Sequence, residues 1–136
     1  MKRMVSGMAV ACMVLAIVVA CRSGGPLYQV TDAPIQTATG KEPSMEEVQK
    51  AIIQAGAGLG WNMSVVKPGE IMGTLNVRSH QAVVTIPYTS KSYSILYKDS
   101  NNLKYDADKQ TIHENYTGWI QRLDGAIKSR LTAAGS

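Results

Sequence analysis

Hydrophobic residues recur with a helical period between Val48 and Leu59. Val48, Ile52, Ala55 and Leu59 stand at i, i+4, i+7 and i+11, so they share one stripe of a helix. The preceding segment Ser44-Met45-Glu46-Glu47 is a capping box, in which the serine hydroxyl can accept from the N–H of the glutamate three residues on. The pattern predicts an amphipathic helix that begins after Ser44.

From Trp61 the period changes to two, which is the period of a strand with one buried face. Four alternating runs follow, separated by short connections, and one connection is the type II turn signal Pro68-Gly69. Connections this short permit antiparallel hairpins and exclude crossover helices. The residues expected to point inward are Trp61, Met63, Val65, Ile71, Gly73, Leu75, Val77, Ala82, Val84, Ile86, Tyr88, Tyr93, Ile95 and Tyr97.

A second helical stripe follows a polar loop, and Thr111-Ile112-His113-Glu114 reads as its capping box. The prediction is therefore an α+β domain over residues 44–131, in the order αββββα, with two amphipathic helices on one face of a four-stranded antiparallel meander. Residues 132–136 are expected to fray. The helical stripe contains Tyr116, Trp119, Ile120, Leu123, Ile127 and Leu131.

Residues 22–43 show no apolar period and are punctuated by glycine and proline, which is typical of a flexible linker. As a coil, this segment would span about 25 Å, and fully stretched it would reach about 75 Å. An alternative is that 27–30 (Leu-Tyr-Gln-Val) docks as an edge strand.

The first 20 residues have the composition of a secretory signal peptide. Lys2 and Arg3 precede an uncharged apolar run from Met4 to Ala20, which is short for a membrane span, although a transmembrane helix is the competing interpretation. Removal of this segment would lower the formal net charge from +4 to +2. Nucleic acid is therefore not an expected partner, because the remaining basic residues are scattered among acidic ones.

The segment Val18-Val19-Ala20-Cys21 resembles the processing site of bacterial lipoproteins, with valine where leucine is commonest. The resemblance implies cleavage before Cys21, a diacylglyceryl group on its sulfur and an acyl chain on its new amine. Such chains would hold residues 21–43 at a membrane as a lipidated tether. Arg22 follows the cysteine, which in that family favours the outer membrane of a Gram-negative host, with the periplasmic face assumed.

The remainder of the chain, from about Ser44 to Leu131, resembles small proteobacterial lipoproteins of unknown function. The resemblance carries no activity, so it supports an envelope domain and adds no mechanism. The matching residues are Gly60-Trp61, Lys67-Pro68-Gly69, Gly73, Arg78-Ser79-His80, Ala82-Val83-Val84, Ile86-Pro87-Tyr88, Tyr93-Ser94-Ile95, Tyr97, Asp99-Ser100, Leu103, Tyr105, Ile112-His113, Tyr116 and Trp119-Ile120.

Candidate chemistry is sparse. Neither a zinc-binding spacing nor a nucleophile elbow occurs, so no metal, cofactor or catalytic residue is predicted, and a hydrolase using Ser79 and His80 is only an alternative. The leading hypothesis is a non-enzymatic lipoprotein that binds an envelope protein or component. The alternative is a carrier of small ligands, with a cleft lined by Arg78, His80, Tyr88, Tyr93, Tyr97 and His113.

Overall fold

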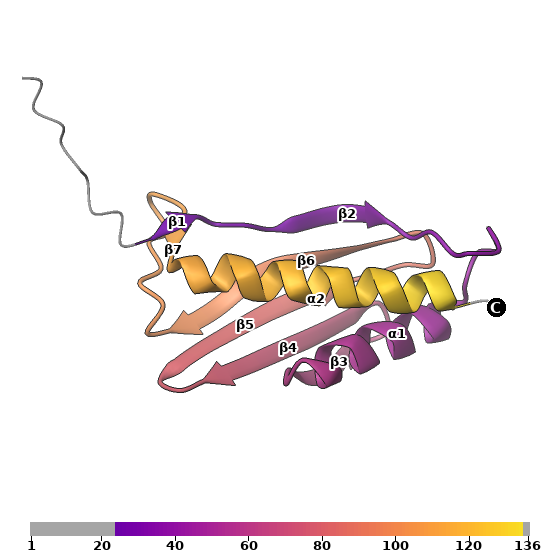
Figure 1. Ribbon diagram of the computed structural model, residues 1–136, viewed down its shortest axis with the longest axis horizontal. Helices are drawn as coiled ribbons and strands as arrows, with labels where there is room; N and C mark the ends of the chain where they lie inside the picture. The colour runs from indigo at the N-terminus through magenta and orange to yellow at the C-terminus, as the bar shows by residue number, and fades with distance from the viewer. Residues whose placement is uncertain (1–23, 135–136) are drawn as a thin grey trace, which may run out of the picture.

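A computed structural model describes residues 24–134 of the 136-residue chain. The proposed signal peptide and Cys21 lie outside the described residues. Within residues 24–134, two α-helices and seven β-strands follow one another in the order ββαβββββα (Figure 1). The elements are β1 (Gly25–Pro26), β2 (Val30–Pro34), α1 (Met45–Gly58), β3 (Asn62–Lys67), β4 (Glu70–Val77), β5 (His80–Pro87), β6 (Ser92–Asn101), β7 (Thr111–Ile112) and α2 (Glu114–Ala133).

The predicted α+β class with two helices on an antiparallel sheet is confirmed. The number of strands is not. The main sheet has five strands in the order β2-β6-β5-β4-β3, and β1 pairs with β7 in a separate two-stranded ribbon. Strands β3 to β6 form the predicted meander, and β2 adds to it through β6, with Val30 opposite Ile95. The order αββββα therefore omits three strands.

The N-terminal segment corrects the prediction of a flexible tether. Val30 and Ala33 are both buried in the core, and the backbone N–H of Asp32 donates to Ser94 Oγ at 2.9 Å. Farther upstream, the N–H of Leu27 donates to the carbonyl of Gln110 at 2.8 Å. The folded unit therefore includes residues 24–43 and does not begin at residue 44.

Helix α1 begins as predicted, because Ser44 Oγ accepts from the N–H of Glu47 at 3.1 Å. The N-cap of helix α2 lies two residues later than the predicted cap at Thr111. Thr111 and Ile112 form β7, and the N-cap is His113, whose side chain accepts from the N–H of Asn115. At its other end α2 continues to Ala133, so Thr132 is helical and not frayed.

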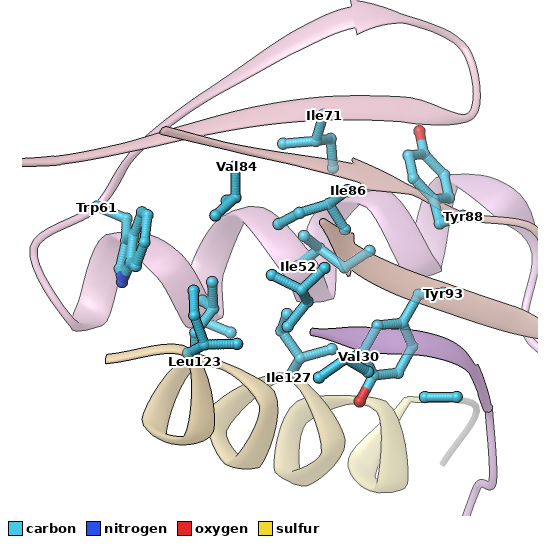
Figure 2. Packing of buried hydrophobic residues seen from close by; sticks show 14 of the residues in the cluster. Val30, Ile52, Trp61, Ile71, Val84, Ile86, Tyr88, Tyr93, Leu123 and Ile127 are labelled. Carbon is cyan, nitrogen blue, oxygen red and sulfur yellow. The ribbon is translucent and has the colours of Figure 1, made fainter. Parts of the chain in front are cut away.

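The core lies between the two helices and one face of the sheet. Figure 2 shows Ile52 of α1 and Ile127 of α2 facing residues of the sheet such as Val84 and Ile86. The predicted alternation holds closely in β5, where the fully buried residues are Ala82, Val84 and Ile86. The alternation fails in β3, near the edge of the sheet. Val65 was expected to point inward, but its side chain is 45% exposed.

Two turns position the ends of the strands. Gly69 has φ +88°, as the predicted type II turn requires, and it joins β3 to β4. Arg78 begins the turn between β4 and β5 and has φ +54°, a left-handed conformation that is uncommon for a residue with a side chain. This turn places His80 opposite Val77 at the start of β5.

Candidate functional site

The structure brings together two of the predicted site residues, His80 and His113. Their ring centroids are 5.7 Å apart, although 33 residues separate them in the sequence. His80 has the same parity in β5 as Ala82 and Val84, so it lies on the face of the sheet that the helices cover. Trp119 of α2 completes the cluster, with its ring centroid 6.3 Å from that of His80. Sequence reasoning placed Trp119 only in the helical stripe.

Each imidazole already has a structural hydrogen bond. His80 Nδ1 lies 2.6 Å from the carbonyl oxygen of Asn102, so this nitrogen donates. His113 Nδ1 accepts from the N–H of Asn115 at 3.1 Å, so this nitrogen carries no proton. In the neutral rings, Nε2 of His80 is therefore an acceptor and Nε2 of His113 is a donor.

Arg78 lies in the same turn as His80 and is exposed. Among residues 24–134, its guanidinium has no carboxylate within 4.0 Å, since the ion pair in that range joins Lys128 to Asp124. Ser79, the hypothetical nucleophile, accepts a hydrogen bond from Asn102 Nδ2 at 2.9 Å. The turn therefore has one free cationic side chain beside the two histidines.

Tyr97 belongs to a cluster of tyrosines near the start of α2. Its ring stacks on that of Tyr105 at a centroid distance of 4.0 Å and meets that of Tyr116 edge-on at 5.9 Å. Burial raises the pKa of Tyr97, while the hydrogen bond between its hydroxyl and Ser100 Oγ, at 2.8 Å, opposes that shift. The Tyr116 hydroxyl is buried and has no hydrogen-bond partner among the described residues.

Tyr88 and Tyr93 lie at the other end of the β5–β6 hairpin, where they face each other across an isolated bridge. Tyr88 is eight residues from His80, which corresponds to about 25 Å along a strand. Its hydroxyl donates to Gln49 Oε1 of α1 at 2.9 Å. In Figure 2, the hydroxyls of Tyr88 and Tyr93 point in opposite directions, and that of Tyr93 points toward α2.

Tyr93 has a partner that sequence reasoning missed. Its hydroxyl donates to Oδ1 of Asp124, which is only 8% exposed, and Lys128 Nζ lies 2.9 Å from Oδ2 of the same carboxylate. Burial, followed by the hydrogen bond to Asp124 and the charge of that group, raises the pKa of Tyr93. The available signal was the i,i+4 spacing of Asp124 and Lys128 beside the apolar stripe.

Several clefts open on the surface, and none of those described here is lined by the six predicted residues. One of about 290 Å³ lies between the helices, with Lys50, Gln54 and Arg130 on its walls. The Arg130 guanidinium there donates to Gln54 Oε1 at 3.0 Å. Another of about 370 Å³ lies beside the β1–β7 ribbon. The predicted aromatic cleft does not coincide with either.

Within residues 24–134, no three side chains of His, Cys, Asp or Glu converge as metal ligands. Neither helix of this range has the length and hydropathy needed to cross a membrane. No family model, curated protein or solved structure matches the chain.

Proposed function

We propose that the chain is a membrane-anchored envelope lipoprotein with no enzymatic role, which binds an envelope protein or component. The observation that carries this proposal is that five of the six candidate side chains use a polar atom within the fold. The hydroxyls of the three tyrosines and Nδ1 of both histidines are hydrogen-bonded to other parts of the domain. General acid–base catalysis requires a group that is free to reach a substrate proton. The three tyrosine hydroxyls are used inside the fold, which favours binding over acid–base catalysis by these residues.

The anchor in this proposal is lipid on Cys21, and Arg22 favours the outer membrane. The fold changes how far the domain can stand from that membrane. Gly24 is the third residue after Cys21, and three residues span at most about 10 Å. The 75 Å reach expected of a coil over 22–43 is excluded by β1 and β2. The folded domain itself would therefore lie directly at the membrane surface.

The anchor is tested by metabolic labelling with a clickable palmitate analogue, followed by membrane fractionation. The natural chain should be labelled and remain with membranes, whereas Cys21→Ser should lose the label and become extractable at high pH. A matched Cys12→Ser variant should behave like the natural chain, since it changes only the proposed signal peptide. Labelling that persists in Cys21→Ser would contradict the anchor.

The partner is tested by site-specific photo-crosslinking in intact envelopes. Both helices cover one face of the sheet, and Thr85 of the central strand β5 has the parity of the opposite face. A photoreactive residue at Thr85 should give one discrete crosslinked product with an envelope protein. The same residue at Gln121, an exposed position of α2, is the control. Identical products from the two positions would count against specific binding.

The alternative function is the binding of a small carboxylate or other anion beside His80, His113 and Arg78. The proximity of the two imidazole rings favours this candidate over a cleft at Tyr88 and Tyr93. A thermal-shift screen with envelope metabolites tests it, with His80→Ala as the matched variant. A stabilising compound should lose its effect in His80→Ala, and a flat response across the screen would exclude this alternative.

A further inference from the structure

Strand β3 leaves one edge of the main sheet open. It pairs only with β4, and among the described residues no backbone group of Asn62–Lys67 bonds to another strand on its far side. Unpaired N–H and C=O groups in a row form a template for a further strand. This edge can therefore accept one.

The opposite edge is protected against such pairing. In β2, Asp32 has φ +49°, the register shifts between Val30 and Ala33, and Pro34 ends the strand without an N–H donor. In β3, the register shifts only between Val65 and Lys67, near the C-terminal end. The segment from Asn62 to Val65 remains regular, without proline or charge.

The open edge is also where hydrophobic side chains are exposed. In the described part of the chain, the exposed large hydrophobic residues belong to α1, its C-cap and β3. We call this surface the α1–β3 edge. It consists of Met45 (42% exposed), Leu59 (40%), Val65 (45%) and Val66 (53%).

Helix α1 and strand β3 form one continuous surface. In Figure 1, α1 lies in front of β3 at one side of the molecule, and a Cβ at Gly56 of α1 would lie only 2.5 Å from Met63 Sδ of β3. Met45, at the start of the helix, lies beside Gly69, which follows β3. Exposed hydrophobic side chains around an open strand edge indicate an interaction site.

We propose that the α1–β3 edge binds a second copy of this chain, through antiparallel pairing of β3 with β3. A two-fold axis perpendicular to the sheet at Ser64 would place Met63 of each copy opposite Val65 of the other. Both residues lie on the helix-covered face, so this register keeps side chains of the same face together. The small Ser64 side chains meet at the axis, and the two five-stranded sheets become one continuous sheet.

Charge complementarity selects a second copy as the occupant. The last turn of α1 contains no basic residue, so its carbonyl groups lack a cation. In this register Lys67, at the end of one β3, lies opposite Trp61 of the other copy and therefore near the end of its α1. The two Lys67 side chains lie at opposite ends of the junction and do not repel each other.

The test uses the full-length chain in mild detergent, made free of cysteine by Cys12→Ser and Cys21→Ser. On this background, Ser64→Cys should form an intermolecular disulfide on mild oxidation, because directly opposite Cα atoms of antiparallel strands lie within disulfide range. The matched control is Ser129→Cys on the exposed surface of α2. The reaction at position 64 should be at least about ten-fold faster, since pairing raises the effective thiol concentration.

Light scattering provides the second measurement. The cysteine-free chain should have the mass of a dimer, and Val65→Lys should reduce it to a monomer with an unchanged circular dichroism spectrum. Ser129→Lys should remain dimeric. A monomeric parent chain with equal disulfide rates at both positions would overturn the proposal. The pairing does not depend on the lipid anchor, so this result would leave the proposed envelope function standing.

Discussion

The hydroxyl of Tyr93 in β6 donates a hydrogen bond of 2.5 Å to the carboxylate of Asp124 in α2. Tyr93 is 1% exposed, and the contact joins the sheet to the helix inside the core. Lys128 satisfies the second oxygen of the carboxylate from the solvent side, at 2.9 Å. A buried carboxylate is costly unless its oxygens are bonded, so Tyr93 explains how α2 tolerates Asp124.

Tyr93→Phe should therefore destabilise the fold. The change preserves the shape of the ring but leaves one buried oxygen of Asp124 without its donor, which costs about 1–3 kcal/mol. Urea denaturation measures the loss. Tyr97→Phe is the control. The Tyr97 hydroxyl bonds to Ser100 at a half-buried position, so its removal should lower the free energy of unfolding less. Equal stability of Tyr93→Phe and the natural chain would show that this bond contributes nothing.

Tyr116→Phe should instead stabilise the fold. The Tyr116 hydroxyl is buried without a partner among the described residues, so its removal relieves the cost of desolvation. We expect a gain of about 1 kcal/mol in the free energy of unfolding. Tyr93→Phe and Tyr116→Phe each remove one buried hydroxyl, yet the first should lower the free energy of unfolding and the second should raise it. A clear loss of stability in Tyr116→Phe would mean that this hydroxyl is bonded.

Stability should fall in alkaline solution from about pH 10 upward. Burial raises the pKa of Tyr116, with smaller contributions from Tyr97 and Tyr105, and burial together with Asp124 raises that of Tyr93. Below pH 10 these tyrosines are protonated in both the folded and the unfolded state, so their contribution is constant. Above it, they ionise first in the unfolded chain, which lowers stability by about 1.4 kcal/mol per pH unit for each tyrosine.

The measurement of this effect is urea denaturation between pH 9 and pH 11.5. Tyr116→Phe should make the fall of stability with pH less steep by the contribution of one tyrosine, about 1.4 kcal/mol per pH unit. Tyr93→Phe is the comparison, and it should reduce the slope by the same amount, because burial also raises the pKa of Tyr93. A flat profile across this range would contradict the burial of both hydroxyls.

His113 should be replaceable by a better helix cap. Its Nδ1 accepts the N–H of Asn115, as an aspartate or serine oxygen would do at the same position. His113→Ala should cost about 0.5–2 kcal/mol, whereas His113→Asp should retain most of the stability. Ser44→Ala at the start of α1 provides a reference for a conventional cap. If aspartate were as harmful as alanine, the contact with His80 would matter more than the cap.

Elements that depend on a local sequence pattern were predicted correctly. The alternation in β5 and the stripe of α2 are reproduced by the core, because each inward residue in a regular element repeats at a fixed interval. Within the α2 stripe, Trp119 is the half-buried member. The cap at Ser44 and the turn at Gly69 are equally local, and both are confirmed.

Strand β2 had no such pattern. Its two buried residues, Val30 and Ala33, are three positions apart, because left-handed Asp32 interrupts the alternation between them. A period of two cannot detect a strand with this irregularity. The β1–β7 ribbon was missed for a related reason, since each strand has two residues and depends on pairing across the whole chain.

The arrangement of the candidate residues also depends on distant contacts. Tyr88, Tyr93 and Tyr97 were all expected to point inward, but inward pointing does not reveal which partner each hydroxyl meets. Gln49, Asp124 and Ser100 supply the three partners. The meeting of His80 with His113 required the register of β5 and the start of α2, both of which are set by tertiary packing.

The three-residue spacing from Cys21 to Gly24 would also control how the domain is oriented. Antiparallel pairing at β3 turns the two copies end for end, so their Gly24 residues point in opposite directions along the strands. If lipid on Cys21 anchors each copy as proposed, both can enter one bilayer only when the two-fold axis stands upright on the membrane. The joined sheet would then lie parallel to the lipid surface, with one face toward the headgroups and the other open to soluble partners.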